Sequence, residues 1–539
     1  MGIFDKSEKK VQQYDHDVSP TDLPAYPHRE STDVEDGLFE NADQLRRRLG
    51  NRQIQLIAIG GSIGTALFVS IGTGLARGGP GSLFLAYLIH SCVLALVNNC
   101  IAEMTVLMPV SGGFIRMAGH WVDDALGFTA GWNFFFYEAL LIPFEITALN
   151  TVLGFWRDDI PTWAVCIGCI VLYAAINVLA VKAYGEAEFW LSGGKVILIF
   201  MLFSFTFITM VGGNPQGDAY GFRYWNKPGA FAEHITTGTL GRFEGFLAAL
   251  WSAAFTVVGP EYINMVAAEA KRPRIYIKAA FKTVYWRFCL FFIMGALAVG
   301  IVVPYNDPVL VAILSGEASG GGTAAASPYV IAMQNLGISV LPDVVNALLV
   351  TSIFSAGNTY TYCATRSLYG MAIEGRAPKF LRKCTNNGVP VYCFAIVMIF
   401  PFLSFLSVSA SANVALVWLT SLITAGGMIT YIIMCITYLF FFFGYSSYIP
   451  WSVSNFFINY TMLIVAPILY IGWKLIHKTK LVGPLEADLV WERPGIDAYE
   501  QTFIDPPTGF WSDMLDLVTF GMLHRGKKQD RRASSVAQM

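Results

Sequence analysis

A series of long apolar runs constrains this chain more than any other feature of its sequence. A run of about 20 apolar residues, rising 1.5 Å per residue, covers the roughly 30 Å of hydrocarbon in a bilayer. Of the 539 residues, 55% are hydrophobic and only 14% are charged, whereas a soluble protein carries about 25% charge. We therefore expect an all-α polytopic membrane protein. The runs lie at about 54–76, 83–109, 126–155, 161–181, 190–212, 243–267, 285–304, 329–365, 389–409, 413–437 and 455–473.

Basic residues beside these runs predict which ends lie in the cytosol, because cytosolic loops are enriched in lysine and arginine. Three basic clusters fall on one side of the membrane if each run up to the tenth crosses it once. They precede the first run, separate the sixth from the seventh, and separate the eighth from the ninth. Their members are Arg46, Arg47, Arg48 and Arg52, then Lys271, Arg272, Arg274, Lys278 and Lys282, then Arg366, Arg376, Lys379, Arg382 and Lys383.

The first run contains a cluster of glycines, Gly60, Gly61 and Gly64. Each glycine disfavours a helix by about 1 kcal/mol relative to alanine. An unwound turn at membrane depth is tolerated only where protein or a water-filled cavity satisfies its N–H and C=O groups. The glycines therefore predict a helix that is broken at a binding site, with close helix packing as the alternative.

The sixth run is interrupted by Gly259 and Pro260. Proline lacks an N–H and clashes with the preceding turn, so it breaks the helical hydrogen-bond ladder. Broken spans one and six are the expected pair when two five-helix halves form inverted repeats. N–H groups at one break suit a carboxylate, and carbonyls at the other can accept from an ammonium group. The two breaks together predict a site for a zwitterion such as an amino acid.

Ionisable residues inside the runs are further candidates, because each costs about 2.5–3.5 kcal/mol at mid-depth. Lys195 can bind a coupling proton, unless it snorkels to an interface. Glu145 can accept a proton or face the cavity, or it can pair with a neighbouring helix for structural reasons. Glu261 follows the second break and can cap the half-helix there. The remaining members of this set are Glu103, Glu138 and Glu269.

Uncharged side chains beside the breaks also matter. Phe255 can act as an aromatic lid over a bound solute, although a phenylalanine buried in a helix usually only packs. Ser62 and Thr65 add hydroxyl groups beside the first break.

Other classes of function lack support in the sequence. It has no HExxH, GxSxG or Walker motif, and its seven histidines are scattered, so we expect no enzyme, metal or cofactor. The net charge of −2 and the lack of a basic run interleaved with aromatics argue against nucleic-acid binding. The nine cysteines lie mostly inside apolar runs, which argues against a disulfide framework.

Several motifs carry a resemblance to a known family. They are Arg47-Arg48-Leu49, Ile57–Thr65, Val110–Phe114, Pro143–Glu145, Ala267–Pro273, Gly375–Pro378, Trp451–Val453 and Tyr470–Lys474. With them, the chain resembles the fungal amino acid permeases of the amino acid/polyamine/organocation superfamily over about residues 44–490. The resemblance implies a leucine-transporter-like fold of twelve helices, both termini in the cytosol, and proton-driven uptake at the plasma membrane.

The resemblance also implies a backbone site for the substrate. It places the carboxylate of an α-amino acid on main-chain groups of the first break and the amino group on carbonyls of the second. The residues that it assigns to substrate binding are Ser62, Gly64, Thr65, Ala254, Phe255 and Gly259, with Gly60, Gly61, Pro260 and Glu261 forming the breaks and their cap.

Three side chains receive roles from the same resemblance. Phe255 corresponds to the aromatic gate, Lys195 to the fifth-helix lysine linked to proton coupling, and Glu145 to the third-helix glutamate important for activity. Ala66 departs from the family, which usually has glycine there, and this narrows the freedom of that turn.

The preferred substrate is predicted from two local likenesses. Residues 133–150 and 488–494 look most like the dicarboxylic amino acid permeases. An acidic side chain would need a cation in the cavity, and Lys195 is the clear candidate inside a run. We therefore expect a proton-coupled symporter that imports glutamate and aspartate preferentially. The alternatives are a broad or neutral amino acid permease and a non-transporting amino acid sensor.

The chain divides into four expected segments. Residues 1–50 form a disordered cytosolic tail, 51–437 a ten-helix transport core, 438–480 a truncated pair of C-terminal helices, and 481–539 a cytosolic tail.

The truncation is inferred from charge near the C-terminus. Lys474, Lys478 and Lys480 suggest a cytosolic end, yet the runs that separate them from the preceding cytosolic loop would place them outside. We infer that a cytosolic loop and most of an eleventh helix are missing, through a deletion or an error in the gene model. An external tail is the alternative. In the tails, Lys6, Lys9 and Lys10 are candidate ubiquitin acceptors, and Glu486 and Asp488 a candidate export signal for vesicle-coat machinery.

Overall fold

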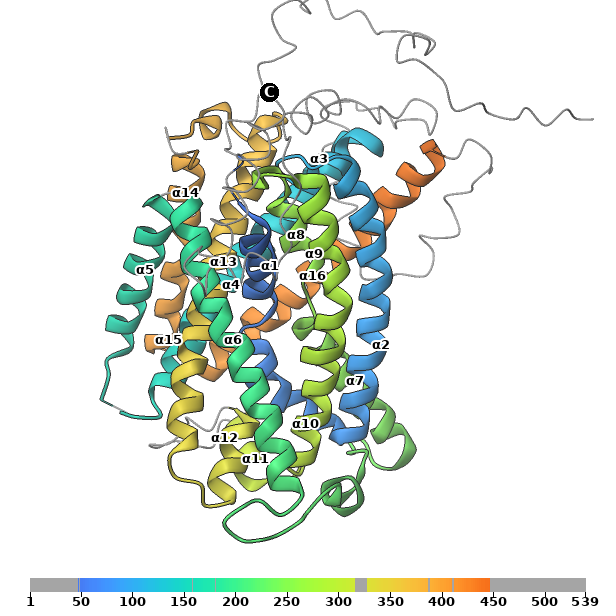
Figure 1. The fold of residues 1–539 in the computed structure, drawn as a ribbon, viewed down its shortest axis with the longest axis vertical. Coiled ribbons are helices and arrows are strands. Elements are labelled where there is room, and N and C mark those ends of the chain that lie inside the picture. The colour runs from blue at the N-terminus through green and yellow to red at the C-terminus, as the bar shows by residue number, and fades with distance from the viewer. Residues whose placement is uncertain are drawn as a thin grey trace, which may run out of the picture. The chain divides into compact units, whose positions relative to one another are not determined.

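The computed structural model contains helices and no strand in the residues that it describes. These are residue 47 and residues 49–157, 159–179, 181–315, 327–385, 388–409 and 412–445. Long helices run alongside one another, with α1 in the interior of the bundle (Figure 1). The all-α fold expected from the sequence is therefore confirmed for this part of the chain.

The elements follow one another in this order: α1 (Asn51–Ser62), η1 (Ala66–Ser70), α2 (Ile71–Leu107), α3 (Gly113–Trp121), α4 (Asp124–Leu153), α5 (Thr162–Leu179), α6 (Val181–Met210), η2 (Trp225–Gly229), α7 (Gly238–Thr256), α8 (Pro260–Met265), η3 (Ala267–Glu269), α9 (Pro273–Arg287), η4 (Phe288–Ile293), α10 (Met294–Val302), α11 (Pro308–Ser315), α12 (Pro328–Asn335), α13 (Leu341–Ile373), η5 (Lys379–Arg382), α14 (Val391–Val397), η6 (Phe400–Phe405), α15 (Leu406–Ser409) and α16 (Ala412–Tyr445).

Seven helical segments among the described residues are long and apolar enough to cross a membrane. They are Ala66–Leu107, Asp124–Leu153, Trp190–Met210, Gly238–Glu269, Pro273–Val302, Val391–Val408 and Val417–Phe442. The fourth predicted run forms a shorter apolar helix, Thr162–Val178. The eighth, predicted as one run at 329–365, is divided between the short α12 and α13, and α13 is long but carries polar side chains along its length. These are buried, because α13 packs among α4, α6 and α1 in the interior.

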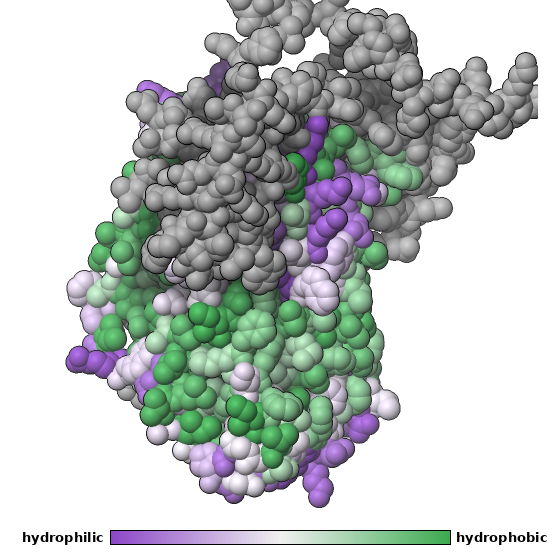
Figure 2. All heavy atoms as spheres, in the orientation of Figure 1, coloured by the Kyte–Doolittle hydropathy of each residue, from purple (hydrophilic) through white to green (hydrophobic). Residues whose placement is uncertain are grey.

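The outer surface of the bundle is apolar. On the face drawn in Figure 2, apolar residues form a broad band, and hydrophilic ones gather at its lower end and at its upper right. Large apolar side chains stand well out from several helices, including Leu96 at 67%, Phe207 at 66% and Trp418 at 69% exposure. Contiguous apolar surface of this kind is unfavourable in water and suits contact with lipid. The chain is a multi-pass membrane protein.

The first predicted break is present. Helix α1 ends at Ser62, and Ile63 has an extended backbone (φ −121°, ψ 103°). The span then resumes through η1 and the start of α2. Inside α2, Gly79 has a φ of 78°, which turns the chain before Pro80 and starts the second span. A side chain at position 79 would also meet the backbone of Ala232, at 2.7 Å from its nitrogen.

The second predicted break is present as well. Helix α7 ends at Thr256, and Val257 is extended (φ −87°, ψ 102°). Gly259 has a φ of 152°, a value that L-residues rarely adopt, and α8 starts at Pro260. Proline fits a first helical position because the N–H that it lacks would have no partner there.

At the C-terminal side, the tenth span is longer than expected. The apolar run was placed at 413–437, but α16 continues to Tyr445. Residues 438–445 therefore extend this span, and the segment boundary expected at 437 does not coincide with a helix end. The predicted run at 455–473, the tails at 1–46 and 446–539, and the tail residues Lys6, Lys9, Lys10, Glu486 and Asp488 lie outside the described residues.

Candidate functional site

The two breaks lie against each other in the interior. A methyl group added to Gly259 would come within 3.6 Å of Ser62 Cβ, so the chain at the second break passes directly by the first. Gly61 faces the ring of Tyr262 on α8, which a Cβ at position 61 would approach to 2.7 Å. Glycine fits there because any side chain would collide with the Tyr262 ring. Main-chain groups of both broken spans therefore share one small region.

Lys195 holds the first break from α6. Its Nζ donates to Gly60 O and to Ile63 O, each at 2.6 Å. The side chain is fully buried, so the snorkelling alternative does not apply in this structure. Two carbonyls released by the unwinding thus receive a charged donor, a stronger kind of hydrogen bond than one between neutral groups.

Glu145 holds the other side of the same break from α4. Its Oε2 accepts a hydrogen bond from the Thr65 hydroxyl at 2.5 Å, and its Oε1 lies 3.4 Å from the Thr65 N–H. Gly64 passes so close that a Cβ there would lie 2.6 Å from Glu145 Oε1. The first break is therefore held between a lysine on one helix and a glutamate on another.

The serine beside the break is engaged within its own helix. Ser62 Oγ donates to Ala58 O at 2.9 Å and lies 3.2 Å from Ile59 O. The Thr65 hydroxyl is used by Glu145, as described above. Neither hydroxyl is directed at a solute in this conformation, so a substrate would have to displace these bonds to use them.

Glu261 lies at the start of the second half-helix. Its Oε2 accepts from the N–H of Gly259 at 3.1 Å, and its Oε1 accepts from the Tyr431 hydroxyl of α16 at 2.9 Å. A carboxylate at a helix N-terminus satisfies N–H groups that have no helical partner. This is the contact that the capping interpretation requires.

Phe255 borders a cavity that also touches Thr65, just after the first break. Its ring meets that of Phe144 edge-on, with centroids 5.3 Å apart. Ala254 precedes it in the last turn of α7, where carbonyls lack helical partners. A cavity of about 200 Å³ is lined by Phe255, Phe144 and Thr65 and also by Arg77 and by Leu310 and Ile313 of α11. A solute of amino acid size fits this volume.

The ends of the two broken spans are tied together on the side of the basic clusters. Leu49, just before α1, accepts at its C=O from the Lys271 N–H and donates its own N–H to Glu269 O, both at 2.9 Å. The Glu269 side chain, fully buried, accepts from Tyr362 at 2.5 Å and from Arg366 at 2.7 Å. These contacts join the start of the first broken span and the end of the second to α13.

Several residues of the site escaped the sequence analysis. The Tyr360 hydroxyl donates to Gly61 O at 3.0 Å, and Tyr431 binds Glu261. Arg287 lies within the predicted run at 285–304 without being singled out there, and it is buried in the continuous segment that α9, η4 and α10 form. These residues can be found only when it is known which helices face the breaks. A single sequence does not give that information.

Glu138 is an in-span candidate without a clear bonding role. It is fully buried on α4, and neither carboxyl oxygen has a hydrogen-bond partner among the described residues. It lies within electrostatic range of Glu261. Glu103, by contrast, is exposed and accepts from the Tyr438 hydroxyl at 2.7 Å, outside the region of the breaks.

A charged cluster outside the membrane-spanning part joins α3 to the end of α13. Glu374 accepts from Arg116 Nε at 2.5 Å, and His120 Nε2 lies 2.9 Å from its other oxygen. Burial opposes ionisation of this carboxyl, but the His120 hydrogen bond and the Arg116 charge outweigh it and lower its pKa to about 2. Because the pKa is below its ordinary 4.5, the cluster stabilises the fold above that pH and loses this contribution as the pH falls towards 2.

We expect Glu374→Gln to lower the thermal unfolding midpoint at neutral pH by a few degrees, because it leaves Arg116 buried without its ionic partner. Thermal unfolding of the purified protein in a lipid nanodisc measures this. Glu233→Gln is the control, since Glu233 forms an exposed pair with Arg242 at 3.7 Å and such pairs contribute little. Equal midpoints for both variants would contradict the assignment.

Comparison with known proteins adds the family. The model of the "Amino acid permease" family matches residues 53–445. The general amino acid permease AGP2 of Saccharomyces cerevisiae is 42% identical over 505 residues, covering 85% of this chain and 84% of the relative. A proline-specific permease of Emericella nidulans is 38% identical, with 75% of this chain and 74% of the relative covered.

Two further comparisons are more distant. The dicarboxylic amino acid permease of Saccharomyces cerevisiae is 37% identical, with 76% of this chain and 67% of the relative covered. A solved Na⁺-coupled sialic acid symporter shares 12% identity at a TM-score of 0.42, covering 72% of this chain and 79% of that one. The special likeness to dicarboxylic permeases is not confirmed, because the general permease is the more similar of the two. The chain belongs to the amino acid permease family.

Proposed function

We propose that the chain is a proton-coupled symporter that imports amino acids across the plasma membrane. The observation that carries this proposal is the pair of adjoining breaks, of which the first is held by Lys195 on one side and Glu145 on the other. Relatives named as general, proline-specific and dicarboxylic permeases support transport. A non-transporting sensor or an enzyme has no comparable support.

Proton coupling follows from the contact between Glu145 and Thr65. The Thr65 hydroxyl and N–H face the carboxylate of Glu145, and these are donors that a substrate carboxylate would use. Protonation of Glu145 removes its charge and weakens both contacts, since hydrogen bonds to charged groups are the stronger ones. Thr65 is then available to the substrate. Proton and substrate binding therefore favour each other, as symport requires.

In the proposed cycle the proton gradient sets the direction of net transport, and this conformation is the one that loads solute. The cavity beside Phe255 is lined by residues of α11, which lies in the loop that the basic clusters predict to be external. On the cytosolic side, the bridge between Leu49 and the chain around Glu269 closes the path. A carrier in this conformation takes up its solute from outside. Release would require the Leu49 bridge and the Glu269–Arg366 contact to open.

The side-chain preference does not follow from Lys195 alone. Both first-break carbonyls engage the Lys195 ammonium, so its use for an acidic side chain would cost those bonds. The cavity beside Phe255 is lined by Arg77 and by neither Glu138 nor Glu261, so its charge does not argue against an acidic side chain. The general permease is more similar to this chain than the dicarboxylic permease is. On that likeness we favour the broad or neutral range over the acidic one.

Uptake of labelled amino acids by cells that express the chain tests both parts of the proposal. The panel contains glutamate, aspartate, leucine, proline and lysine, each at about pH 5 and about pH 7. We expect faster uptake at the lower pH and a preference for neutral over acidic amino acids. Uptake independent of pH would reject proton coupling, and a clear preference for glutamate would restore the acidic assignment.

Glu145→Gln tests the coupling residue. The amide still offers an oxygen to Thr65 but cannot take up a proton. We expect the ratio of uptake at pH 5 to uptake at pH 7 to fall to about one, while the protein remains at the cell surface. Glu103→Gln is the control, because Glu103 is exposed and far along the chain from both breaks. A Glu145→Gln variant that keeps the pH dependence would remove this residue from the coupling mechanism.

A further inference from the structure

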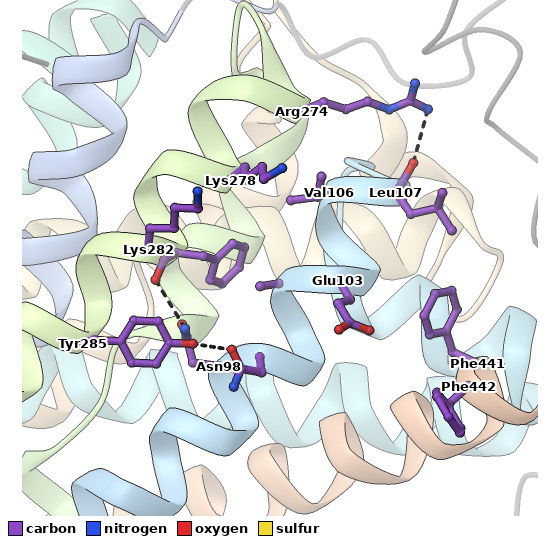
Figure 3. Close-up of a pocket in the computed structure, with 13 residues that line it drawn as sticks. Asn98, Glu103, Val106, Leu107, Arg274, Lys278, Lys282, Tyr285, Phe441 and Phe442 are labelled. Carbon is purple, nitrogen blue, oxygen red and sulfur yellow. Dashed lines mark hydrogen bonds between the residues drawn. The ribbon is translucent and has the colours of Figure 1, made fainter. Parts of the chain in front are cut away.

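A large groove lies between α2 and α9, away from the two breaks. Its volume is about 750 Å³, and its walls come from α2, α9 and the end of α16 (Figure 3). The lining residues that matter below are Glu103, Arg274, Lys278, Lys282, Phe441 and Phe442. Nothing in the transport proposal uses this groove.

One wall of the groove is a row of positive charges. Arg274, Lys278 and Lys282 are four residues apart on α9, so they share one helix face. At 1.5 Å per residue the row extends about 12 Å along the helix. It lies in the first turns of the segment Pro273–Val302, at the end of that span which the basic residues predict to be cytosolic. Lys278 and Lys282 are exposed, while Arg274 donates to Leu107 O at 3.5 Å across the groove.

The wall opposite the basic row is apolar. Asn99 and Tyr285 add polar groups elsewhere in the groove, but the Tyr285 hydroxyl already donates to Asn99 Oδ1. Phe441 and Phe442 project from α16 into the view of Figure 3, opposite the basic row, and Phe442 is 43% exposed. A soluble anion gains nothing from such surroundings, whereas acyl chains do.

One acidic group partly neutralises the positive charge of the groove. Glu103 lines the groove from α2, and its Oε2 accepts from the Tyr438 hydroxyl at 2.7 Å. The lysines nevertheless outnumber it. A head group with a phosphate and a second anionic group fits this arrangement, and Glu103 allows an ammonium group beside them.

We infer that this groove binds an anionic glycerophospholipid of the cytosolic leaflet, with its head group on Lys278 and Lys282 and its acyl chains against Phe441 and Phe442. Basic pockets between spans on the cytosolic side have the chemistry that recognises such head groups. The basic row suits the anionic head group of a lipid, and the apolar opposite wall suits its acyl chains. Bound lipid would fix α9 against α2 and α16.

The test uses the full-length protein in nanodiscs, either of phosphatidylcholine alone or with a minor share of phosphatidylserine. We expect phosphatidylserine to raise the thermal midpoint of the unmodified protein by a few degrees, because a ligand that binds only the folded state stabilises it. The Lys278→Gln/Lys282→Gln variant should lose at least half of that shift. Lys379→Gln/Lys383→Gln, in the other cytosolic basic loop, is the matched control and should keep it.

Other outcomes overturn the proposal. Equal shifts in the two double variants would show a general surface effect of anionic lipid. A shift of the same size with water-soluble glycerol phosphate would assign the groove to a free anion. Loss of the shift on deletion of residues 1–46, with both lysines intact, would assign the effect to that tail. Because the readout is unfolding and not uptake, a failed transport proposal leaves this test valid.

Discussion

Replacing Lys195 with alanine lowers coupled amino acid uptake by at least about 100-fold, in our expectation, while the protein still reaches the cell surface. The variant removes the donor of two hydrogen bonds to Gly60 O and Ile63 O. Hydrogen bonds to charged groups contribute about 1.5–3 kcal/mol each. The loss therefore amounts to about 3–6 kcal/mol at the first break, and about 1.4 kcal/mol corresponds to a tenfold effect.

The measurement is uptake of labelled substrate at low external pH, together with exchange between equal internal and external substrate. If Lys195 carries the coupling, exchange survives and net accumulation is lost. If it only supports the break, both are lost. Lys379→Ala is the control, because Lys379 is an exposed lysine in a cytosolic loop. Normal accumulation by Lys195→Ala would contradict any role for this side chain in transport.

The breaks themselves could be predicted because they depend on local chemistry. Gly60, Gly61 and Gly64 weaken a helix wherever it lies, and Pro260 removes a helical hydrogen bond in any surroundings. The first break falls at Ile63 and Gly64, because Gly60 and Gly61 are still part of α1. The second falls after Thr256, just before Gly259 and Pro260. The sequence also placed Glu261 beside a helix start, and a carboxylate there satisfies free N–H groups.

The partners of the site could not be predicted, because they depend on which helix faces meet. From the sequence, the Lys195 side chain could either extend to a membrane interface or be buried in the interior. Only the position of α6 beside α1 directs its ammonium to the break. The hydroxyl of Thr65 looked like a substrate donor, yet Glu145 takes it in this conformation. Arg287 lies inside the predicted run at 285–304, but its burial depends on the helices that pack around α9, which the sequence does not reveal.

Gly64→Ala is the second variant with a large expected effect. A Cβ at this position would lie 2.6 Å from Glu145 Oε1 and 2.8 Å from Ala356 Cβ. Neither neighbour can retreat easily, since Glu145 is bound to Thr65 and Ala356 belongs to the buried helix α13. Inserting a methyl group into a packed interior costs about 1–3 kcal/mol. Here the displaced group is also the proposed proton carrier, so we expect uptake to fall by at least about tenfold.

Gly168→Ala separates this steric effect from the general effect of adding a methyl group to a membrane helix. Gly168 lies in α5, and an added Cβ would meet nothing within 4 Å. Alanine favours a helix by about 1 kcal/mol over glycine, so this variant should transport normally and unfold at the same temperature or slightly higher. Gly64→Ala should instead lose uptake at all pH values, because the methyl group displaces Glu145 whether or not it is protonated. Full uptake by Gly64→Ala would mean that the first break opens more widely during transport than the contact with Glu145 allows, and the coupling proposed for that contact would then fail.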